Sequence, residues 1–245
     1  MLISKKHKYV FLCNTKCASN SVEAMLKPYS EMALVGIQTV RHTYFTDYDR
    51  YIKPYLKVVA QADNLETICI IREPLSWLNS WYRFRSRTTL RNPDHPNHHK
   101  STFGMEFSEF IKAYMLPEPP AFAKDIDSQF NFVKNSLGEV GVDTIFLYED
   151  LDRLVDYMSH RVDRNLKLKN INVSPKKATF KKLSKFNFPW TSQSKGINGT
   201  NSMPQSAAKK YRISEDLLSS LHKFISQDFE LYETLKNSPP PFHSS

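Results

Sequence analysis

The chain has 245 residues, of which 40% are hydrophobic and 24% charged, and its formal net charge is +9 at pH 7. This balance is that of an ordinary globular protein and excludes a disordered or fibrous chain. No apolar run approaches the roughly 18–20 residues that a transmembrane helix requires, and the run at residues 9–13 is shorter than the core of a signal peptide. We therefore expect a cytoplasmic protein without a membrane span. The positive charge favours an anionic partner, such as a nucleotide, a nucleic acid, a phosphorylated or sulfated sugar, or an acidic lipid.

Cysteine and glycine usage narrows the kind of site. The cysteines Cys13, Cys17 and Cys69 are odd in number and form no Cys-x-x-Cys pair, so neither a disulfide framework nor a zinc site is indicated. The chain has only six glycines, so a phosphate-binding loop would have to use other small residues. We expect no bound metal ion.

Four apolar runs bounded by polar residues predict strands, and alternating helical patterns lie between them. The predicted strands are residues 8–14, 33–40 (the weakest), 66–72 and 142–148. The predicted helices are residues 19–27, 45–62, 75–87, 128–140, 150–161 and 214–235. The apolar runs are nearly continuous, which is typical of strands covered by helices on both faces. The sequence therefore predicts an α/β fold of three layers, with a mostly parallel central sheet.

Residues 1–236 are expected to form a single domain. Two long polar stretches, 87–104 and 176–213, have few apolar anchors. Loops of this length inside a domain are usually functional or partly disordered, so we expect them to act as lids over an acceptor or to lack order. The proline-rich tail, residues 237–245, is expected to be disordered.

The first candidate site follows the strand at residues 8–14. Lys16 precedes a turn of small residues, Cys17 to Ser21, that opens the next helix. A helix N-terminus leaves backbone N–H groups unpaired and attracts an anion, and small side chains let a phosphate approach that backbone. The pattern lacks the glycines and the Lys-Ser/Thr pair of a Walker A motif. The alternative is a simple helix cap with a solvated Lys16.

The second candidate site lies at the end of the strand at residues 66–72. Arg72 ends this strand, and Ser80 follows eight residues later in the next helix. Ligands of parallel sheets bind at the carboxyl ends of the strands, so Arg72 is expected to face the same crevice as Lys16. A guanidinium group can donate two hydrogen bonds to one phosphate. The alternative is that Arg72 pairs with a carboxylate at the strand end.

Together these motifs resemble those of the sulfotransferases that use 3′-phosphoadenosine 5′-phosphosulfate (PAPS). The run from Lys16 to Ser21 looks like their 5′-phosphosulfate loop, and Arg72 with Ser80 looks like their 3′-phosphate motif. The run at residues 71–82 is close to the form in bacterial members of the carbohydrate branch, and residues 148–151 resemble the family's Tyr-Glu-Asp-Leu segment. The resemblance covers most of residues 5–175. Ala18 stands where glycine is commoner, Asn20 replaces a hydroxyl residue, and Glu73 replaces aspartate.

This resemblance implies a P-loop NTPase-like sulfotransferase fold and transfer of a sulfuryl group from PAPS without a metal. The acceptor would be a hydroxyl or amine of a carbohydrate or small metabolite, and no nucleic acid would be bound. By analogy, Lys16 would stabilise the transferring sulfuryl group. The residues that would bind PAPS are Lys16, Cys17, Ala18, Ser19, Asn20, Ser21, Arg72, Ser80 and Tyr148. Tyr148 would contact the adenine or simply pack in the core.

An alcohol acceptor must lose a proton, and histidine suits the role of general base near neutral pH. We predict that His42 is this base, since it follows the apolar run at residues 33–40 and its setting resembles a histidine of bacterial relatives. The alternative is that His42 caps the helix beginning near Thr43. The histidines His95, His98 and His99 favour a solvated lid over a metal site. Arg83, Arg85 and Arg87 are expected on a mixed solvent-facing surface, with contact to an anionic acceptor as the alternative. The side chains expected in the core are Trp77 and Trp81.

Two other functions compete with sulfuryl transfer. A P-loop nucleotide kinase would need Mg²⁺ and ATP, and the missing Gly-Lys-Ser/Thr counts against it. A non-catalytic basic module that binds polyanions or nucleic acid would show a steep, general salt dependence. A sulfotransferase should instead bind one adenosine bisphosphate saturably.

Overall fold

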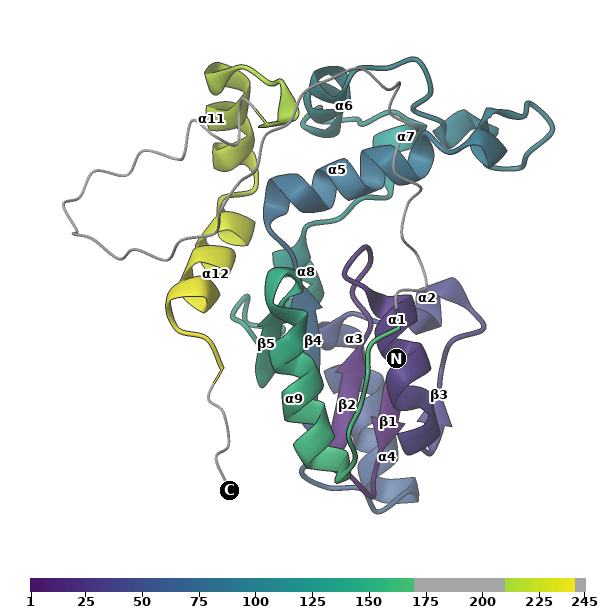
Figure 1. Ribbon diagram of the computed structural model, residues 1–245, viewed down its shortest axis with the longest axis vertical. Coiled ribbons are helices and arrows are strands. Elements are labelled where there is room, and N and C mark those ends of the chain that lie inside the picture. The colour runs from purple at the N-terminus through teal and green to yellow at the C-terminus, as the bar shows by residue number, and fades with distance from the viewer. Residues whose placement is uncertain (170–209, 241–245) are drawn as a thin grey trace, which may run out of the picture.

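The computed structural model describes residues 1–169 and 210–240 (Figure 1). A five-stranded sheet lies at its centre, with the strand order β3-β1-β2-β4-β5. The strands are β1 (Leu2–Ser4), β2 (Tyr9–Leu12), β3 (Met32–Ala33), β4 (Glu66–Ile71) and β5 (Thr144–Leu147). Strand β4 pairs in parallel with β2 and β5, whereas β1 is antiparallel to both β2 and β3. Every strand except β1 therefore runs in the same direction, which confirms a mixed α/β fold with a mostly parallel sheet.

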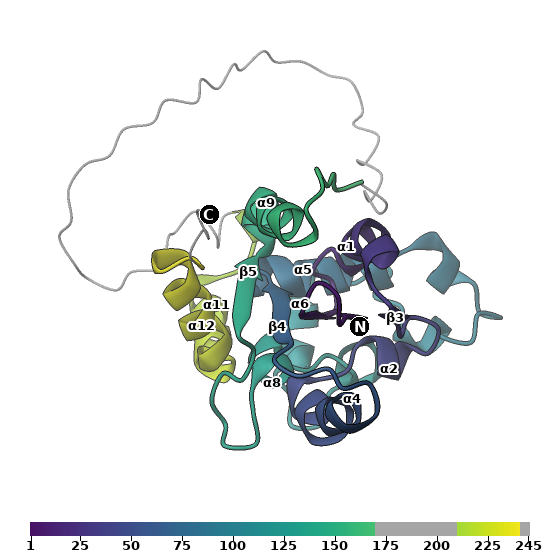
Figure 2. The ribbon, with the colours of Figure 1, turned by 90° about the horizontal axis from the view of Figure 1, so that it is seen from below.

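Alternating side chains of the strands enter two different cores, because successive residues of a strand face opposite sides of the sheet. Phe11, Ile68 and Ile70 pack with one cluster, and Val10 and Cys69 with the other. Figure 2 shows α1 (Ser19–Leu26) and α9 (Leu151–Val162) on one face of the sheet, with α4 (Lys53–Val59) and α8 (Gln129–Val133) on the other. The expected cover of helices on both faces is therefore confirmed, while the closer likeness to a P-loop fold stays a prediction.

The remaining helices connect the strands or form the upper part of the molecule in Figure 1. They are α2 (Gln38–Arg41), α3 (Phe45–Asp47), a π-helical turn (Tyr48–Ile52), α5 (Pro74–Arg85), α6 (Phe107–Tyr114), α7 (Ala121–Lys124), α11 (Glu215–Phe224) and α12 (Ser226–Asn237). Short 3-10 helices cover Lys27–Tyr29, Thr88–Arg91, His98–Lys100 and Tyr148–Asp150. Pro74 is the first residue of α5, where its missing N–H costs little. The Glu73 carboxylate caps the helix by accepting hydrogen bonds from two backbone N–H groups of its first turn.

Several predicted elements are wrong in type or extent. The strand predicted at residues 33–40 survives only at Ala33, because the chain leaves the sheet there and residues 38–41 form α2. The helix predicted at residues 128–140 ends at Val133, since Lys134 pairs with Val140 across a turn. The helix predicted at residues 214–235 is divided into α11 and α12 at Ile225, whose backbone leaves the helical region.

Two regions could not be compared in full with the predictions. Most of the loop predicted at residues 176–213 lies outside the described residues, as do residues 241–245 of the predicted tail. Residues 87–104 contain two short 3-10 helices and otherwise no helix or strand. The single domain over residues 1–236 stays a prediction. Within the described ranges, no helix has both the length and the apolar character needed to cross a bilayer.

Candidate active site

The loop that follows β2 is fastened to its surroundings by hydrogen bonds on both sides. The amide of Asn14 donates to the carbonyl of Ile70 on the neighbouring β4 over 3.2 Å. The hydroxyl of Ser19, the first residue of α1, donates back to the carbonyl of Asn14 over 2.5 Å. The indole N–H of Trp77, from α5, donates to the carbonyl of Thr15 over 2.9 Å. These bonds hold the loop at the carboxyl ends of β2 and β4.

Two residues of this loop have backbone angles that favour glycine. Lys16 has φ of 61°, and Ala18, which directly precedes α1, has φ of 57°. A Cβ atom makes this left-handed conformation unfavourable by roughly 1–2 kcal/mol. The position at which the sequence departs from the commoner glycine is thus a strained position, and the loop keeps a tight turn there despite Ala18.

Arg72 lies at the end of β4 with its guanidinium held from three sides. Its Nε donates to the hydroxyl of Ser76 over 2.9 Å, and its Nη1 donates to the carbonyl of Lys16 over 3.5 Å. The ring of Tyr148 lies 4.1 Å from the guanidinium carbon. No carboxylate within the described residues forms an ion pair with Arg72. The alternative of a strand-end ion pair therefore finds no support there.

A cavity of about 710 Å³ joins the two candidate motifs. It lies beneath α5, which crosses above the edge where β2 and β4 end, and beside α1 and α2 (Figure 1). The predicted site residues that line it are Lys16, Ala18, Ser19, Asn20, Ser21, His42, Arg72, Ser80 and Tyr148. The sequence motifs thus share one cavity, although what they bind there stays a prediction.

Cys17 is the predicted site residue that does not line the cavity. Its side chain is buried, and its thiol donates to Oε1 of Gln129 over 3.5 Å. Burial raises the pKa of this thiol well above its usual range, so the group stays protonated and inert. Any contact of Cys17 with a ligand must come from its backbone.

The lining of the cavity is strongly cationic. It includes Lys16, Arg41, Arg72, Arg83 and Arg87, and no aspartate or glutamate is among the described residues that line it. Burial, together with the nearby Arg87 and Arg72, lowers the pKa of Lys16 to about 8. A buried cationic group without a carboxylate is stabilised by binding an anion. The cavity is therefore suited to a ligand with several negative charges.

Arg41 differs from the other cations of the lining because it already forms an ion pair with a carboxylate. Its guanidinium forms a two-pronged ion pair with Glu23 of α1, with distances of 2.8 and 2.7 Å. It also donates to the side-chain oxygen of Asn20. This contact ties α2 to the start of α1 and leaves the amide N–H₂ of Asn20 as the group that can donate to a ligand.

His42 follows directly after α2 and contacts the loop beyond β2. Its Nδ1 lies 2.6 Å from the carbonyl of Cys13, which can only accept, so Nδ1 carries the proton and Nε2 keeps a lone pair. Burial lowers the pKa of His42, partly offset by this hydrogen bond. The ring is therefore neutral at pH 7. Since α3 begins at Phe45 after Tyr44, His42 does not cap the start of that helix; it is instead the C-cap residue of α2.

Sequence reasoning missed part of the lining contributed by α5. Ser80, Arg83 and Phe84 line the cavity, and their spacing of three and four residues places them on one face of α5. Arg87, two residues beyond the end of α5, lines it as well. The spacing of Arg83 and Phe84 from Ser80 is the sequence signal that could have identified this face. Phe84 lies against Lys16, with 4.1 Å between the ammonium nitrogen and the ring centre.

Trp81 and Arg85, also on α5, lie in environments that differ in part from those predicted. Trp81, expected in the core, packs against the core cluster and also lines the cavity. Its indole N–H is buried without a hydrogen-bond partner among the described residues. Arg85, expected on a solvent-facing surface, is 4% exposed and donates to the carbonyl of Ala121 over 3.3 Å. The two side chains contact each other, with 5.1 Å between the guanidinium carbon and the Trp81 ring.

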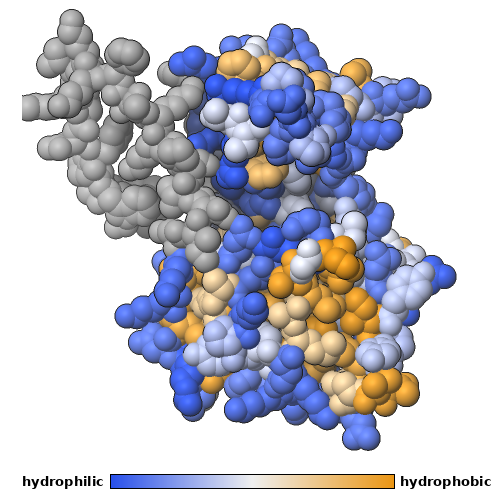
Figure 3. All heavy atoms as spheres, turned by 90° about the vertical axis from the view of Figure 1, so that its right-hand side faces the viewer, coloured by the Kyte–Doolittle hydropathy of each residue, from blue (hydrophilic) through white to orange (hydrophobic). Residues whose placement is uncertain are grey.

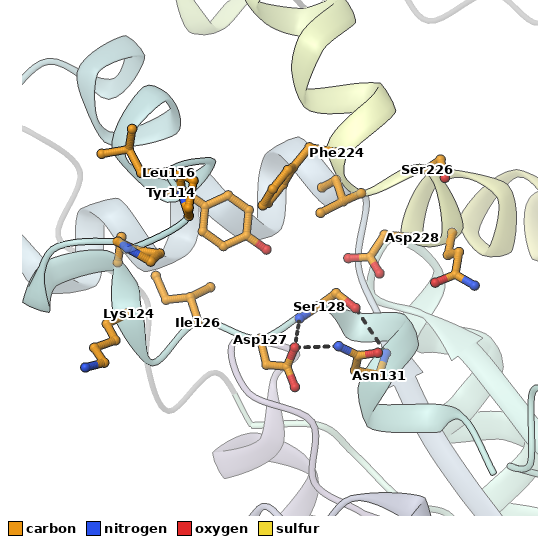
Figure 4. Close-up of a pocket in the computed structure, with 15 residues that line it drawn as sticks. Tyr114, Leu116, Lys124, Ile126, Asp127, Ser128, Asn131, Phe224, Ser226 and Asp228 are labelled. Atoms are coloured by element: carbon orange, nitrogen blue, oxygen red, sulfur yellow. Dashed lines mark hydrogen bonds between the residues drawn. The ribbon is translucent and has the colours of Figure 1, made fainter. Parts of the chain in front are cut away.

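A second cavity, of about 480 Å³, lies between α6, α8 and the junction of α11 with α12 (Figure 4). None of the predicted site residues lines it. Asp228 is 1% exposed there and accepts hydrogen bonds from the backbone N–H groups of Gln129 and Phe130, over 3.0 and 2.8 Å. Burial raises the pKa of Asp228 to about 6. This carboxylate thus anchors the first turn of α8.

The described residues contain no group of three or more His, Cys, Asp or Glu side chains arranged to hold a metal ion. In the loop at residues 87–104, Nδ1 of His98 lies 3.0 Å from the carbonyl of Leu90, and Nδ1 of His95 accepts a hydrogen bond from the backbone of Asn97. These ring nitrogens have local partners.

Comparison with known proteins agrees with the motifs. The chain matches the model of the sulfotransferase family over residues 1–233, and it belongs to this family. The match supports sulfuryl transfer as the general activity. Searches of curated proteins and of solved structures found no significant match.

Proposed function

We propose that the protein transfers a sulfuryl group from PAPS to a hydroxyl or amine of a carbohydrate or small-metabolite acceptor. The observation that carries the proposal is the single cavity lined by both Lys16 and the Arg72–Ser80 pair, with no carboxylate among its described lining residues. A donor with phosphate groups at both ends of one nucleoside requires two anion sites within the same cavity. The P-loop-like fold, the bacterial carbohydrate branch and the cytoplasmic location stay predictions.

The chemistry of the lining residues fits this donor. The 5′-phosphosulfate would lie against the backbone N–H groups at the start of α1, with the side chains of Ser19, Asn20 and Ser21 beside it. The 3′-phosphate would lie between Arg72 and Ser80, since no described carboxylate forms an ion pair with Arg72 at contact distance, although Glu149 interacts with it electrostatically. Tyr148, whose ring lies against Arg72, would contact the adenine or serve only to position the guanidinium.

His42 and Lys16 would perform the protein's part of the chemistry. PAPS supplies the sulfuryl group: the acceptor oxygen or nitrogen forms a bond to sulfur as the bond between sulfur and the 5′-phosphate oxygen breaks. Nε2 of His42 takes the proton of the acceptor, because Nδ1 is committed to the carbonyl of Cys13. The ammonium group of Lys16 stabilises the negative charge that develops on the leaving phosphate. The hydrogen bonds that the loop after β2 forms with its surroundings and with His42 keep Lys16 and His42 in place before the reaction.

Nucleotide binding tests the donor site. In thermal unfolding, adenosine 3′,5′-bisphosphate should raise the melting temperature well above the value with 5′-AMP or ATP, with or without Mg²⁺, because a ligand of the native state stabilises it. Arg72→Ala with Ser80→Ala should remove the advantage of the 3′-phosphate, whereas the exposed Arg164→Ala should keep it. If the wild type does not distinguish adenosine 3′,5′-bisphosphate from 5′-AMP, the assignment of Arg72 and Ser80 fails.

Turnover tests the base. His42→Ala should abolish sulfuryl transfer with donor binding largely kept, and the exposed His99→Ala should leave both unchanged. Unchanged turnover in His42→Ala would remove His42 from the mechanism. A requirement for Mg²⁺ and ATP would instead favour a nucleotide kinase. Steep, salt-dependent binding of nucleic acid without nucleotide specificity would favour a polyanion-binding module.

A further inference from the structure

The segment formed by the π-helical turn and α4 carries apolar side chains on two faces. On its inner face, Tyr48 and Leu56 are each 1% exposed and pack in the core. On its outer face, the exposed fractions are 61% for Tyr51, 57% for Tyr55, 77% for Val58 and 61% for Val59. We call these four residues the outer stripe. A helix that faces water on one side normally carries polar residues there, whereas one that is apolar all round is covered.

The outer stripe is part of a larger apolar area. Ile37 and Val40, beside and within α2, are also exposed, at 66% and 36%. Figure 3 shows apolar side chains gathered on the lower part of the face that carries β3, α2 and α4. Contiguous exposed apolar areas of more than a few hundred Å² are rare on monomeric soluble proteins and mark interaction sites.

The charges around the outer stripe favour a second copy of this chain as the partner. Residues 47–63 contain three acids (Asp47, Asp49, Asp63) and three bases (Arg50, Lys53, Lys57), so their formal charges cancel. The whole chain has a formal charge of +9, and two such chains repel each other over most of their surfaces. Contact between copies is therefore least opposed at a neutral apolar face. An anionic membrane would select a face with excess positive charge, which this segment lacks.

The placement of the stripe also fits an antiparallel, two-fold contact. Asp49 and Lys57 form ion pairs within their own chain, with Lys53 and Asp63, so these charges need no partner from another copy. A two-fold axis between Tyr51 and Tyr55 brings Tyr51 of one copy beside Tyr55 of the other. Such a contact is self-complementary, as a closed dimer requires.

We propose that the protein forms a symmetric dimer through the outer stripe, with the two α4 helices antiparallel. The structure offers a matched pair of variants to test this contact. Tyr55→Glu places a charge in the middle of the stripe, and Leu137→Glu makes the same charge change at a residue that is 80% exposed and lies in the turn before β5. Both side chains are exposed, so neither substitution should unfold the chain, which circular dichroism would check.

Analytical ultracentrifugation of the full chain, from low to high micromolar concentration, measures the association. We expect a dimer for the wild type and for Leu137→Glu, and a dissociation constant at least tenfold higher for Tyr55→Glu. A wild type that stays monomeric throughout, or a dimer that Tyr55→Glu leaves intact, overturns the proposal. A monomer that binds phosphatidylglycerol vesicles, with binding lost in Tyr55→Glu, overturns it in favour of a membrane surface.

Disulfide cross-linking tests the antiparallel arrangement. Cys13, Cys17 and Cys69 are all buried, so an introduced exposed thiol is the one that reacts in the folded protein. A mixture of Tyr51→Cys and Tyr55→Cys chains should form a mixed disulfide faster than either variant forms a disulfide with itself. Cross-linking that is equal in all three samples overturns the antiparallel contact.

Discussion

The side-chain amide of Gln129 forms two hydrogen bonds with the backbone of Arg72. The N–H of Arg72 donates to Oε1 of Gln129 over 2.8 Å, and Nε2 of Gln129 donates to the carbonyl of Arg72 over 2.7 Å. The same Oε1 also accepts the thiol of Cys17. One buried amide, 1% exposed, therefore links the loop after β2 with the end of β4, and so links the two proposed phosphate sites.

The first prediction concerns this amide as a positioning group. Gln129→Met removes both hydrogen bonds and leaves two backbone groups of Arg72 without partners, a loss of about 1–3 kcal/mol for each buried group. We expect the affinity for adenosine 3′,5′-bisphosphate to fall at least tenfold, and the preference over 5′-AMP to shrink, as measured by isothermal titration calorimetry. The exposed Gln227→Met is the control. Equal losses for the two nucleotides would mean that Gln129 supports the fold without setting the position of Arg72.

A second prediction concerns the strained alanine before α1. Ala18→Gly should raise the free energy of unfolding by about 1 kcal/mol, because glycine adopts a φ of 57° without the steric cost of a Cβ atom. The exposed Ala24, in the interior of the same helix, provides the control of opposite sign. Ala24→Gly should lower the free energy by about 1 kcal/mol. Urea denaturation measures both, and a loss of stability in Ala18→Gly would contradict the strain at this position.

The third prediction is a bell-shaped dependence of kcat/KM on pH. The base must be neutral, and burial lowers the pKa of His42, so activity should rise with pH and level off below the value near 6.5 of a free histidine. Lys16 must be charged, and its pKa of about 8 places the fall in activity near that pH. In kcat the alkaline limb should lie higher, since bound phosphate favours the charged ammonium group.

Lys16→Arg separates the two limbs of this profile. A guanidinium stays charged throughout the range, so the variant should lose the alkaline limb and keep the acid limb, whatever its absolute rate. The comparison uses initial rates with saturating acceptor. An alkaline limb that persists in Lys16→Arg would assign it to another group.

The fourth prediction contrasts two tryptophans of α5. Trp81→Phe removes an indole N–H that has no partner among the described residues, and this gain offsets part of the lost packing. Trp77→Phe removes the hydrogen bond to the carbonyl of Thr15 and should cost about 1–3 kcal/mol more than Trp81→Phe. Thermal unfolding compares the two. A greater loss for Trp81→Phe would indicate a partner for its indole outside the described residues.

The sequence predicted the parts of the fold that depend on long buried runs. Strands β2, β4 and β5 were found because their apolar runs are continuous, whereas β1 and β3 contain three and two residues and have too little periodicity to detect. His42 is predicted to follow a strand at residues 33–40, of which only Ala33 lies in a strand. It nevertheless lines the cavity, because the short helix α2 brings it back to the loop after β2.

Other parts of the site depend on tertiary contacts that no local pattern encodes. Gln129 is separated from Arg72 by 57 positions, and no motif marks it as a partner of either phosphate site. Arg83 and Arg87 are expected to face solvent, because charged residues at a helix end are usually exposed. Both are exposed and both also line the cavity, which no local charge pattern predicts.

The buried carboxylate of Asp228 connects the last helices of the described chain to the cationic cavity. It holds the first turn of α8 through Gln129 and Phe130, and Gln129 in turn holds Arg72. A chain truncated before α11 would keep every residue of the two sequence motifs. It would still lose Asp228, and with it the hydrogen bonds that position Gln129 against Arg72. The C-terminal helices are therefore not a removable appendage, and a shortened form made for crystallisation should retain them.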